Sequence, residues 1–282
     1  MRIKITADST CDLSEELLAQ WDIALMPMHI LMGEDSYLDG VTIHPADVFA
    51  YVNAGGKMPK SAAANLVEYT DFFEPFAKEC DAVIHISVSS KLSSCFQNAK
   101  LAAGEFENVY VVDSQTAAIG TGILAEYALS CAEAGMPADE IAAQLEQKRE
   151  DVCLVALLDT LEYLKRGGRI SKTVALAGGL LNIKPVVTVQ DGEVVLIGKA
   201  RGSKQGNNLL AEKIHTCGGI DFSLPILLGY SGLSDAFLKK YVEDSRSLWQ
   251  DGAEKLDATL ISGVIGTHTG PGVVAAAFFR KH

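Results

Sequence analysis

The sequence predicts an α/β protein of two domains, an N-terminal parallel-sheet α/β layer domain and a C-terminal mixed α+β domain. In the first half, short runs rich in Val and Ile alternate with longer segments of helical periodicity, a pattern typical of βαβ units. In the second half, Asp191-Gly192 lies between two runs of β-forming residues and predicts an antiparallel hairpin. A chain of 282 residues is also long enough for two domains.

The N-terminal domain is expected to span residues 1–150. Its predicted strands are Arg2–Thr6, Asp81–Val88 and Asn108–Val112. Apolar residues recur at helical spacing in four segments, Ser14–Trp21, Leu66–Cys80, Ser94–Phe106 and Ala117–Ala134. Asp12, Ser14 and Asn65 are predicted helix caps, because their side-chain oxygens can accept from unpaired N–H groups of a first turn. Residues 29–57 fit neither period and are expected to be a loop-rich insertion.

The C-terminal domain is expected to span residues 151–282. A helix from Pro137 to about Asp151 precedes it, since proline is tolerated in a first turn. One further helix is expected at Ser234–Trp249. The predicted strands are Val152–Leu158, the hairpin Val186–Ala200, Pro225–Gly229, Ala258–Ile261 and Val273–Phe279. Because the hairpin is antiparallel, the second sheet is expected to be at least partly antiparallel.

Composition excludes several classes of function. The net charge of −12 disfavours nucleic acid as a partner, because an acidic surface repels the phosphate backbone. There is no run of about 18 apolar residues and no signal-peptide pattern, so we expect a cytoplasmic protein without an integral membrane segment. The six cysteines form no C-x-x-C pair and the histidines are scattered, which predicts buried free thiols and no metal site.

Hydroxyl side chains follow the predicted strands. Ser93 and Ser94 lie between the strand Asp81–Val88 and the next helix, where open α/β sheets bind ligands and where free N–H groups suit a carboxylate or phosphate. Ser61, in PKSAAAN, precedes the helix that leads into the same strand, and the turn Asp8-Ser-Thr follows the first strand and could line the same pocket. Alternatively, these residues only cap helices or form Asx-type turns.

His268 lies in GTHTGPG, residues 266–272, which is expected to be a loop. The three glycines leave the imidazole unshielded, and an imidazole can donate a hydrogen bond to an anion or carry a proton. Alternatively, the histidine is incidental.

Basic residues gather in LKRGGRISK and in GKARGSK, which contain Arg166, Arg169 and Arg201. On an acidic protein such clusters can dock a negatively charged partner, or they can be ordinary solvated turns. The sequence has no G-x-x-x-x-G-K-[ST] loop and no dinucleotide fingerprint, so it lacks recognisable machinery for ATP chemistry.

Together these segments resemble the DegV family of bacterial fatty-acid-binding proteins, some of which serve as the acyl carrier subunit of fatty acid kinase. The resemblance covers essentially the whole chain and rests on seven ordered motifs: ITADSTCDLS, PKSAAAN, SSKLSSCFQNA, VVDSQTAAIGTG, LEYLKRGGRIS, GKARGSK and GTHTGPG. The family usually shows Thr-Ser-Gln-Pro-Ser where this chain has Ser61-Ala-Ala-Ala-Asn65, and a glycine where it has Ser94.

The resemblance implies a lipid carrier without catalytic residues or cofactor. A long-chain fatty acid would lie in a buried tunnel between the two domains, its carboxylate bound by Ser61, Ser93, Ser94 and His268. The arginine-bearing turns, with Arg166, Arg169 and Arg201, would meet the catalytic subunit of a separate fatty acid kinase, which phosphorylates the presented carboxylate. Val174–Leu181 and Ile226–Leu228 have a composition suited to the tunnel wall or to plain core.

Two alternatives belong to other classes of protein. One is a lipid ester hydrolase with Ser93 as nucleophile and His268 as base, although the sequence lacks G-x-S-x-G and shows no acid near His268. The other is a lipid-responsive sensor whose shape is recognised by another protein.

Overall fold

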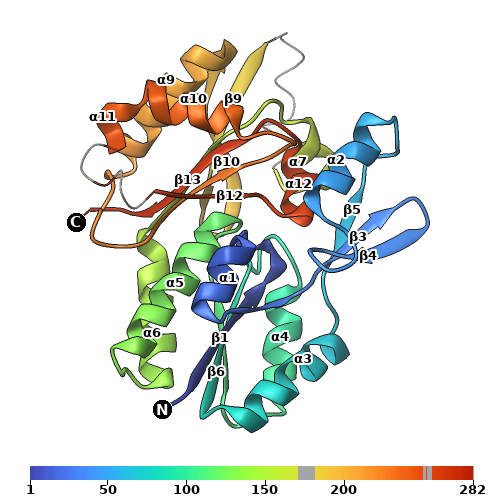
Figure 1. The fold of residues 1–282 in the computed structure, drawn as a ribbon, viewed down its shortest axis with the longest axis vertical. Coiled ribbons are helices and arrows are strands. Elements are labelled where there is room, and N and C mark those ends of the chain that lie inside the picture. Colours follow the sequence, from blue (N-terminus) through green and yellow to red (C-terminus); the bar gives the residue numbers. More distant parts are fainter. Residues whose placement is uncertain (171–181, 250–251, 253–255, 282) are drawn as a thin grey trace.

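Three sheets organise the chain (Figure 1). The computed structural model describes residues 1–170, 182–249, 252 and 256–281. A four-stranded sheet in the order β2-β1-β6-β7 is parallel throughout, and a six-stranded sheet in the order β10-β9-β8-β13-β11-β12 is mixed. The predicted fold class, with a parallel N-terminal and a mixed C-terminal sheet, is therefore confirmed.

Helices cover both faces of the parallel sheet. Its strands are β1 (Ile3–Asp8), β2 (Ala24–Met26), β6 (Ala82–Ser87) and β7 (Val109–Asp113). The helices around it are α1 (Glu15–Trp21), α3 (Leu66–Glu79), α4 (Cys95–Ala103), α5 (Ile119–Glu133) and α6 (Ala138–Lys148). In Figure 1, α3 and α4 lie on one side of this sheet and α5 and α6 on the other. The four predicted helices and three predicted strands of this half are present with small shifts at their ends.

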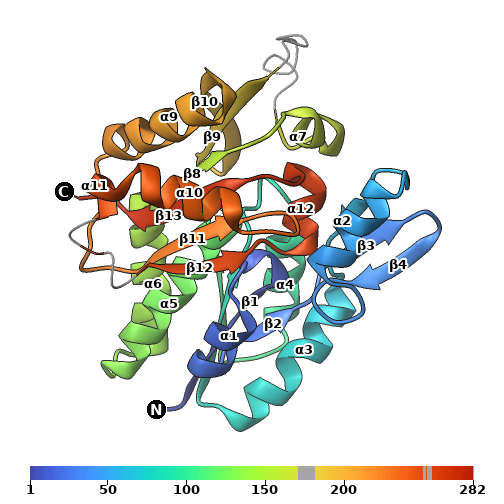
Figure 2. The ribbon, with the colours of Figure 1, turned by 45° about the horizontal axis from the view of Figure 1, so that its top comes forward.

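The six-stranded sheet has α9, α10 and α11 on one face and α5 against the other (Figure 2). Its strands are β8 (Val152–Leu157), β9 (Ile183–Gln190), β10 (Glu193–Arg201), β11 (Ile226–Tyr230), β12 (Asp257–Leu260) and β13 (Val274–Phe279). Its helices are α7 (Glu162–Gly167), α9 (Gly202–Thr216), α10 (Ala236–Asp244), α11 (Arg246–Trp249) and α12 (Gly263–Thr269). Because α5 also packs on β1, it joins the two sheets.

The DG turn forms as predicted. β9 and β10 pair antiparallel with Gln190 opposite Glu193, and Asp191 and Gly192 both have positive φ, as a two-residue hairpin turn requires. The parallel sheet lies within residues 1–150 and the six-stranded sheet within residues 151–282. The division into domains at residue 150 stays a prediction.

The insertion at residues 29–57 is more regular than the sequence predicts. It contains β3 (His29–Met32), β4 (Asp35–Leu38) and α2 (Pro45–Asn53), and β5 (Lys60–Ala62) completes a three-stranded antiparallel sheet with β3 in the centre. Strands of three or four residues are too short to show a period, and β5 is separated from β3 by the helix α2. This small sheet and α2 pack against α12.

Two further predictions are wrong in detail. Ser14 and Asn65 cap α1 and α3, but Asp12 caps no helix and instead ends the 3₁₀ turn Ser9–Cys11 with a φ of 55°. The predicted helix Ser234–Trp249 breaks at Ser245, whose hydroxyl donates to the carbonyl of Tyr241 and accepts from the indole of Trp249. A serine that bonds its neighbouring backbone in this way competes with the helix ladder.

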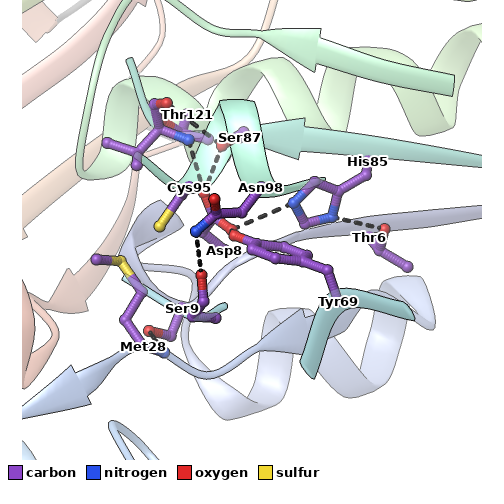
Figure 3. Close-up of polar contacts among 12 residues, drawn as sticks. Thr6, Asp8, Ser9, Met28, Tyr69, His85, Ser87, Cys95, Asn98 and Thr121 are labelled. Atoms are coloured by element: carbon purple, nitrogen blue, oxygen red, sulfur yellow. Dashed lines mark hydrogen bonds and ion pairs between the residues drawn. The ribbon is translucent and has the colours of Figure 1, made fainter. Parts of the chain in front are cut away.

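The carboxyl end of the parallel sheet is held by a buried network around Asp8 (Figure 3). The Asp8 carboxylate accepts from Ser87 Oγ at 2.7 Å, the Val88 N–H at 2.9 Å, His85 Nε2 at 3.2 Å and the Tyr69 hydroxyl. Burial opposes ionisation, but the hydrogen bond and attraction of His85, with Tyr69 and Ser87, outweigh it and lower the pKa of Asp8. The network therefore ties α3 and β6 to the end of β1.

We expect Asp8→Asn to lower the free energy of unfolding by about 3–5 kcal/mol at neutral pH, since an amide oxygen cannot replace a carboxylate that faces this many donors. Tyr69→Phe removes one donor and should cost about 1–2 kcal/mol. Urea denaturation of both variants measures the difference. If both variants lost the same small amount of unfolding free energy, a structural role for the negative charge of Asp8 would be contradicted.

Candidate binding site in an apolar cavity

A cavity of about 170 Å³ lies at the meeting of the two sheets, the small sheet and α12. Most of its wall is apolar and comes from both halves of the chain, including Val88, Leu154, Ala156, Val187, Val264 and Val273. The polar residues of the wall include Thr10, Ser61, Ser93, Ser94, Arg169 and His268. Apolar walls with a few polar groups are typical of sites for small molecules.

His268 lies in the last turn of α12, so the prediction of a glycine loop is wrong. Gly266 lies inside the helix, where a Cβ would be 3.0 Å from the Phe49 ring, and Gly270 ends the helix with a φ of 75°. The imidazole packs on Gly167, where a Cβ would lie 2.2 Å from Nδ1. Gly167 and Gly266 thus allow close packing at and near the imidazole, and the segment is not a flexible loop.

Ser61 and His268 meet in the cavity wall although 207 residues separate them in the sequence. Ser61 Oγ and His268 Nε2 are 2.7 Å apart. Ser61 is part of β5, paired opposite Ile30 of β3, so it is neither a helix cap nor a loop residue. Strand pairing therefore fixes where this hydroxyl points.

The imidazole of His268 is neutral in this structure at neutral pH. Burial, and secondly the positive charge of Arg169, lower the pKa of His268 to about 4. Its Nδ1 is buried and has no hydrogen-bond partner among the residues that the structure describes. A negatively charged group in the cavity would favour the protonated imidazole and raise this pKa again.

Ser93 and Ser94 line the same cavity at the start of α4. Ser93 Oγ accepts from the Cys95 N–H at 3.3 Å and donates to Cys95 Sγ at 3.1 Å, so it also stabilises the first turn. Ser94 occupies the N-cap position without a capping side-chain bond. Ser93 therefore stabilises the helix start and also lines the cavity, and its role in binding an anion stays a prediction.

The three arginines predicted to dock a partner lie in different environments. Arg169 lines the cavity and donates to the carbonyls of Leu92 and Gly167 at 3.2 and 2.6 Å. Arg166 is exposed and pairs with Glu162, and Arg201 is exposed at the start of α9. The backbone bond to Leu92 holds Arg169 next to the turn that carries Ser93.

Two residues of the first strand-end turn have separate roles. Asp8 does not line the cavity and has the hydrogen-bond partners given above. Thr10 does line it, and its buried hydroxyl has no hydrogen-bond partner in the described part of the chain. The sequence pointed to this turn as a whole, through its place after a parallel strand, and did not separate the role of Asp8 from that of Thr10.

Two buried carboxyl groups hold the start of α12. Asp12 Oδ1 accepts from the Ser262 N–H and Asp39 Oδ1 from the Gly263 N–H, each at 3.0 Å. Burial raises the pKa of Asp39 to about 6 against the effect of its hydrogen bond from Ser9, and burial raises the pKa of Asp12 well above its ordinary value. These contacts fix the helix that presents His268, and nothing in the sequence around Asp39 predicts them.

The contacts of Ser93 and His268 do not form the catalytic arrangement that a serine hydrolase requires. The hydroxyl beside His268 belongs to Ser61, while Ser93 bonds Cys95, and no described acid contacts Nδ1 of the imidazole. A Ser-His-Asp arrangement needs all three contacts.

Other predicted features can also be placed. Ile226–Leu228 lie in the core on both faces of β11 and are absent from the cavity wall, and Val174–Leu181 fall outside the described residues. Within the described ranges, no three His, Cys, Asp or Glu side chains gather as a metal site. No helix among the described residues is long and apolar enough to span a bilayer.

Comparisons with known proteins agree over the whole chain. A family model described as "Uncharacterised protein, DegV family" matches residues 2–281. A DegV domain-containing protein of Clostridium perfringens is 32% identical over 285 residues, covering 100% of this chain and 99% of the relative. A solved DegV family protein from Thermus thermophilus, described by its fatty acid binding, has a TM-score of 0.88 at 31% identity, covering 99% and 100% of the two chains. A stearic-acid-binding protein from Eubacterium ventriosum has a TM-score of 0.86 at 25% identity, covering 99% and 98%.

We expect stability to depend on pH through Asp39. Its raised pKa means that the folded state keeps a proton that the unfolded chain releases above about pH 4, so this stabilisation is complete below that pH and is lost as pH rises through about 6. The unfolding free energy of the native chain relative to Asp39→Asn should fall by about 3 kcal/mol between about pH 4 and pH 7.

Denaturation of both proteins across this pH range measures the effect. Asp71→Asn, which changes an exposed carboxylate on α3, is the matched control. The difference in unfolding free energy between the native chain and this variant should not change with pH. If the difference between the native chain and Asp39→Asn also did not change with pH, the raised pKa of Asp39 in the folded state would be contradicted.

Proposed function

The chain belongs to the DegV family, and on that basis we propose that it binds a long-chain fatty acid in the cavity described above. The observation that carries the proposal is the meeting of Ser61 and His268 at 2.7 Å in a wall that is otherwise largely apolar. The solved relatives described as binding fatty acids support it. The acyl tail lies along the apolar wall, and the carboxylate lies at the hydroxyls and the imidazole.

Tail and head contribute differently to binding. A tail of about 14 methylenes contributes on the order of 10 kcal/mol at about 0.8 kcal/mol each, whereas a hydrogen bond to a charged group contributes about 1.5–3 kcal/mol. The tail therefore supplies most of the affinity. The polar residues fix which end of the lipid lies at the head-group site.

The carboxylate is held by Ser61, Ser93, Ser94 and His268 in this proposal. Negative charge beside His268 favours the imidazolium, which reverses the effect of burial on its pKa and provides a charge-assisted hydrogen bond. Arg169 adds positive charge to the same part of the wall.

We further propose that the protein is a carrier and not an enzyme, and that it presents the carboxylate to a separate fatty acid kinase. The absence of a phosphate-binding loop from the sequence supports this division of labour. Because Arg169 lines the cavity, the exposed Arg166 and Arg201 are left to meet the kinase.

We expect His268→Ala to weaken palmitate and oleate binding about 10- to 100-fold, because it removes a charge-assisted hydrogen bond. Ser61→Ala removes a neutral donor and should weaken binding about 2- to 10-fold. Titration calorimetry on delipidated protein measures both affinities. His215→Ala, an exposed histidine on α9, is the control and should bind as the native chain does.

Two results would count against the proposal. Unchanged affinity in both His268→Ala and Ser61→Ala would show that the carboxylate does not bind at these two residues. If the native chain took up neither palmitate nor oleate, fatty-acid binding itself would be excluded.

The hydrolase alternative makes a separate prediction. We expect no turnover of p-nitrophenyl palmitate above the uncatalysed rate, since no acid among the described residues orients Nδ1 of His268. Turnover that disappears in Ser93→Ala would overturn the assignment as a carrier.

A further inference from the structure

Two cysteines outside the cavity approach each other behind the six-stranded sheet. Cys153 is on β8 and Cys217 directly follows α9, and these elements lie side by side in Figure 2. The Cys153 thiol donates to the carbonyl oxygen of Cys217 at 3.5 Å, across 64 residues of sequence. Both cysteines are half-buried, whereas Cys11, Cys80, Cys95 and Cys131 are buried. A small reagent can therefore reach this pair before the other thiols.

The surroundings make the two thiols unequal. Contact with Cys153, and secondarily the charges of Lys213 and Arg280, lower the pKa of Cys217 against the opposing effect of burial. The same contact, with burial and the charge of nearby Asp151, raises the pKa of Cys153. Arg280 also lies 3.5 Å from the Asp151 carboxylate and so stays beside the pair. At neutral pH, Cys217 is the nucleophile and Cys153 is held as the thiol next to it.

We propose that Cys153 and Cys217 form a redox-active dithiol that a low-molecular-weight disulfide oxidises to an intramolecular disulfide. The Cys217 thiolate attacks one sulfur of the small disulfide, whose S–S bond breaks and releases one small thiolate. Cys153 then gives up its proton and attacks the Cys217 sulfur of the mixed disulfide, releasing the second small thiolate. The protein loses two electrons and two protons, and the small disulfide becomes two thiols.

The cross-link would join β8 to the end of α9. On β8, Leu154 and Ala156 line the cavity, while Cys153 and Val155 belong to the opposite face, next to α9. Oxidation would therefore restrain β8, which forms one wall of the cavity, through the face of the strand that points away from the cavity. The dithiol does not depend on lipid binding, and its test needs no lipid.

The experiment exposes the folded, full-length protein to oxidised glutathione and maps the products by mass spectrometry without reduction. The native chain should lose two hydrogen atoms and yield a peptide that links Cys153 to Cys217. Cys153→Ala should stop at a glutathione adduct on Cys217, and Cys217→Ala should leave Cys153 unmodified. Cys131→Ala, which removes a buried thiol, is the control and should cross-link as the native chain does.

The pH dependence of the first step supplies a second readout. Alkylation of Cys217 by iodoacetamide should show a midpoint below that of an ordinary thiol in the native chain. In Cys153→Ala it should move toward the ordinary thiol value of about 8.5, with about tenfold slower reaction at neutral pH. Glutathione on both cysteines without a cross-link, or a native rate in Cys153→Ala, would overturn the proposal.

Discussion

The contact between Ser61 and His268 is the constraint on which the site depends. It joins a short strand of the small sheet to a helix near the end of the chain, and each partner is held from behind by backbone pairing or packing. Asp12 and Asp39 hold the first turn of α12, so the position of the imidazole depends on carboxyl groups from the N-terminal part of the chain. The insertion at residues 29–57 therefore belongs to the architecture of the site, since it supplies both Asp39 and the partner strand of Ser61.

Hydrogen-bond satisfaction separates the structural polar residues from the candidate binding residues. Asp8 is fully buried and accepts from several donors, so it needs nothing from outside the protein. Thr10 follows two residues later and lines the cavity, and its buried hydroxyl has no hydrogen-bond partner among the described residues. An unpaired polar atom is costly in an apolar environment, so this hydroxyl favours a ligand that pairs with it.

The glycines of GTHTGPG illustrate a difference between pattern and packing. Sequence reasoning takes three glycines around a histidine as a sign of a loop, because glycine is unfavourable in helices. In the structure, Gly266 lies within α12, where a Cβ would be 3.0 Å from the Phe49 ring, and Gly270 ends the helix with a φ of 75°. One of these glycines thus allows the Phe49 ring to pack closely on the helix, and another ends the helix. The first role depends on a residue from a distant part of the chain.

The sequence by itself determined the fold class, the Asp191-Gly192 hairpin, the helices around the parallel sheet and the resemblance to a family, because these follow from local periodicity, turn chemistry and ordered motifs. It also pointed to Ser61, Ser93, Ser94 and His268 through the resemblance. Only the tertiary structure decided that Ser61 and His268 touch, that Arg169 lines the cavity while Arg166 is exposed, and that Asp12 and Asp39 hold α12. These contacts join residues up to 250 positions apart, and such pairs are set by how the sheets and helices pack rather than by any local pattern.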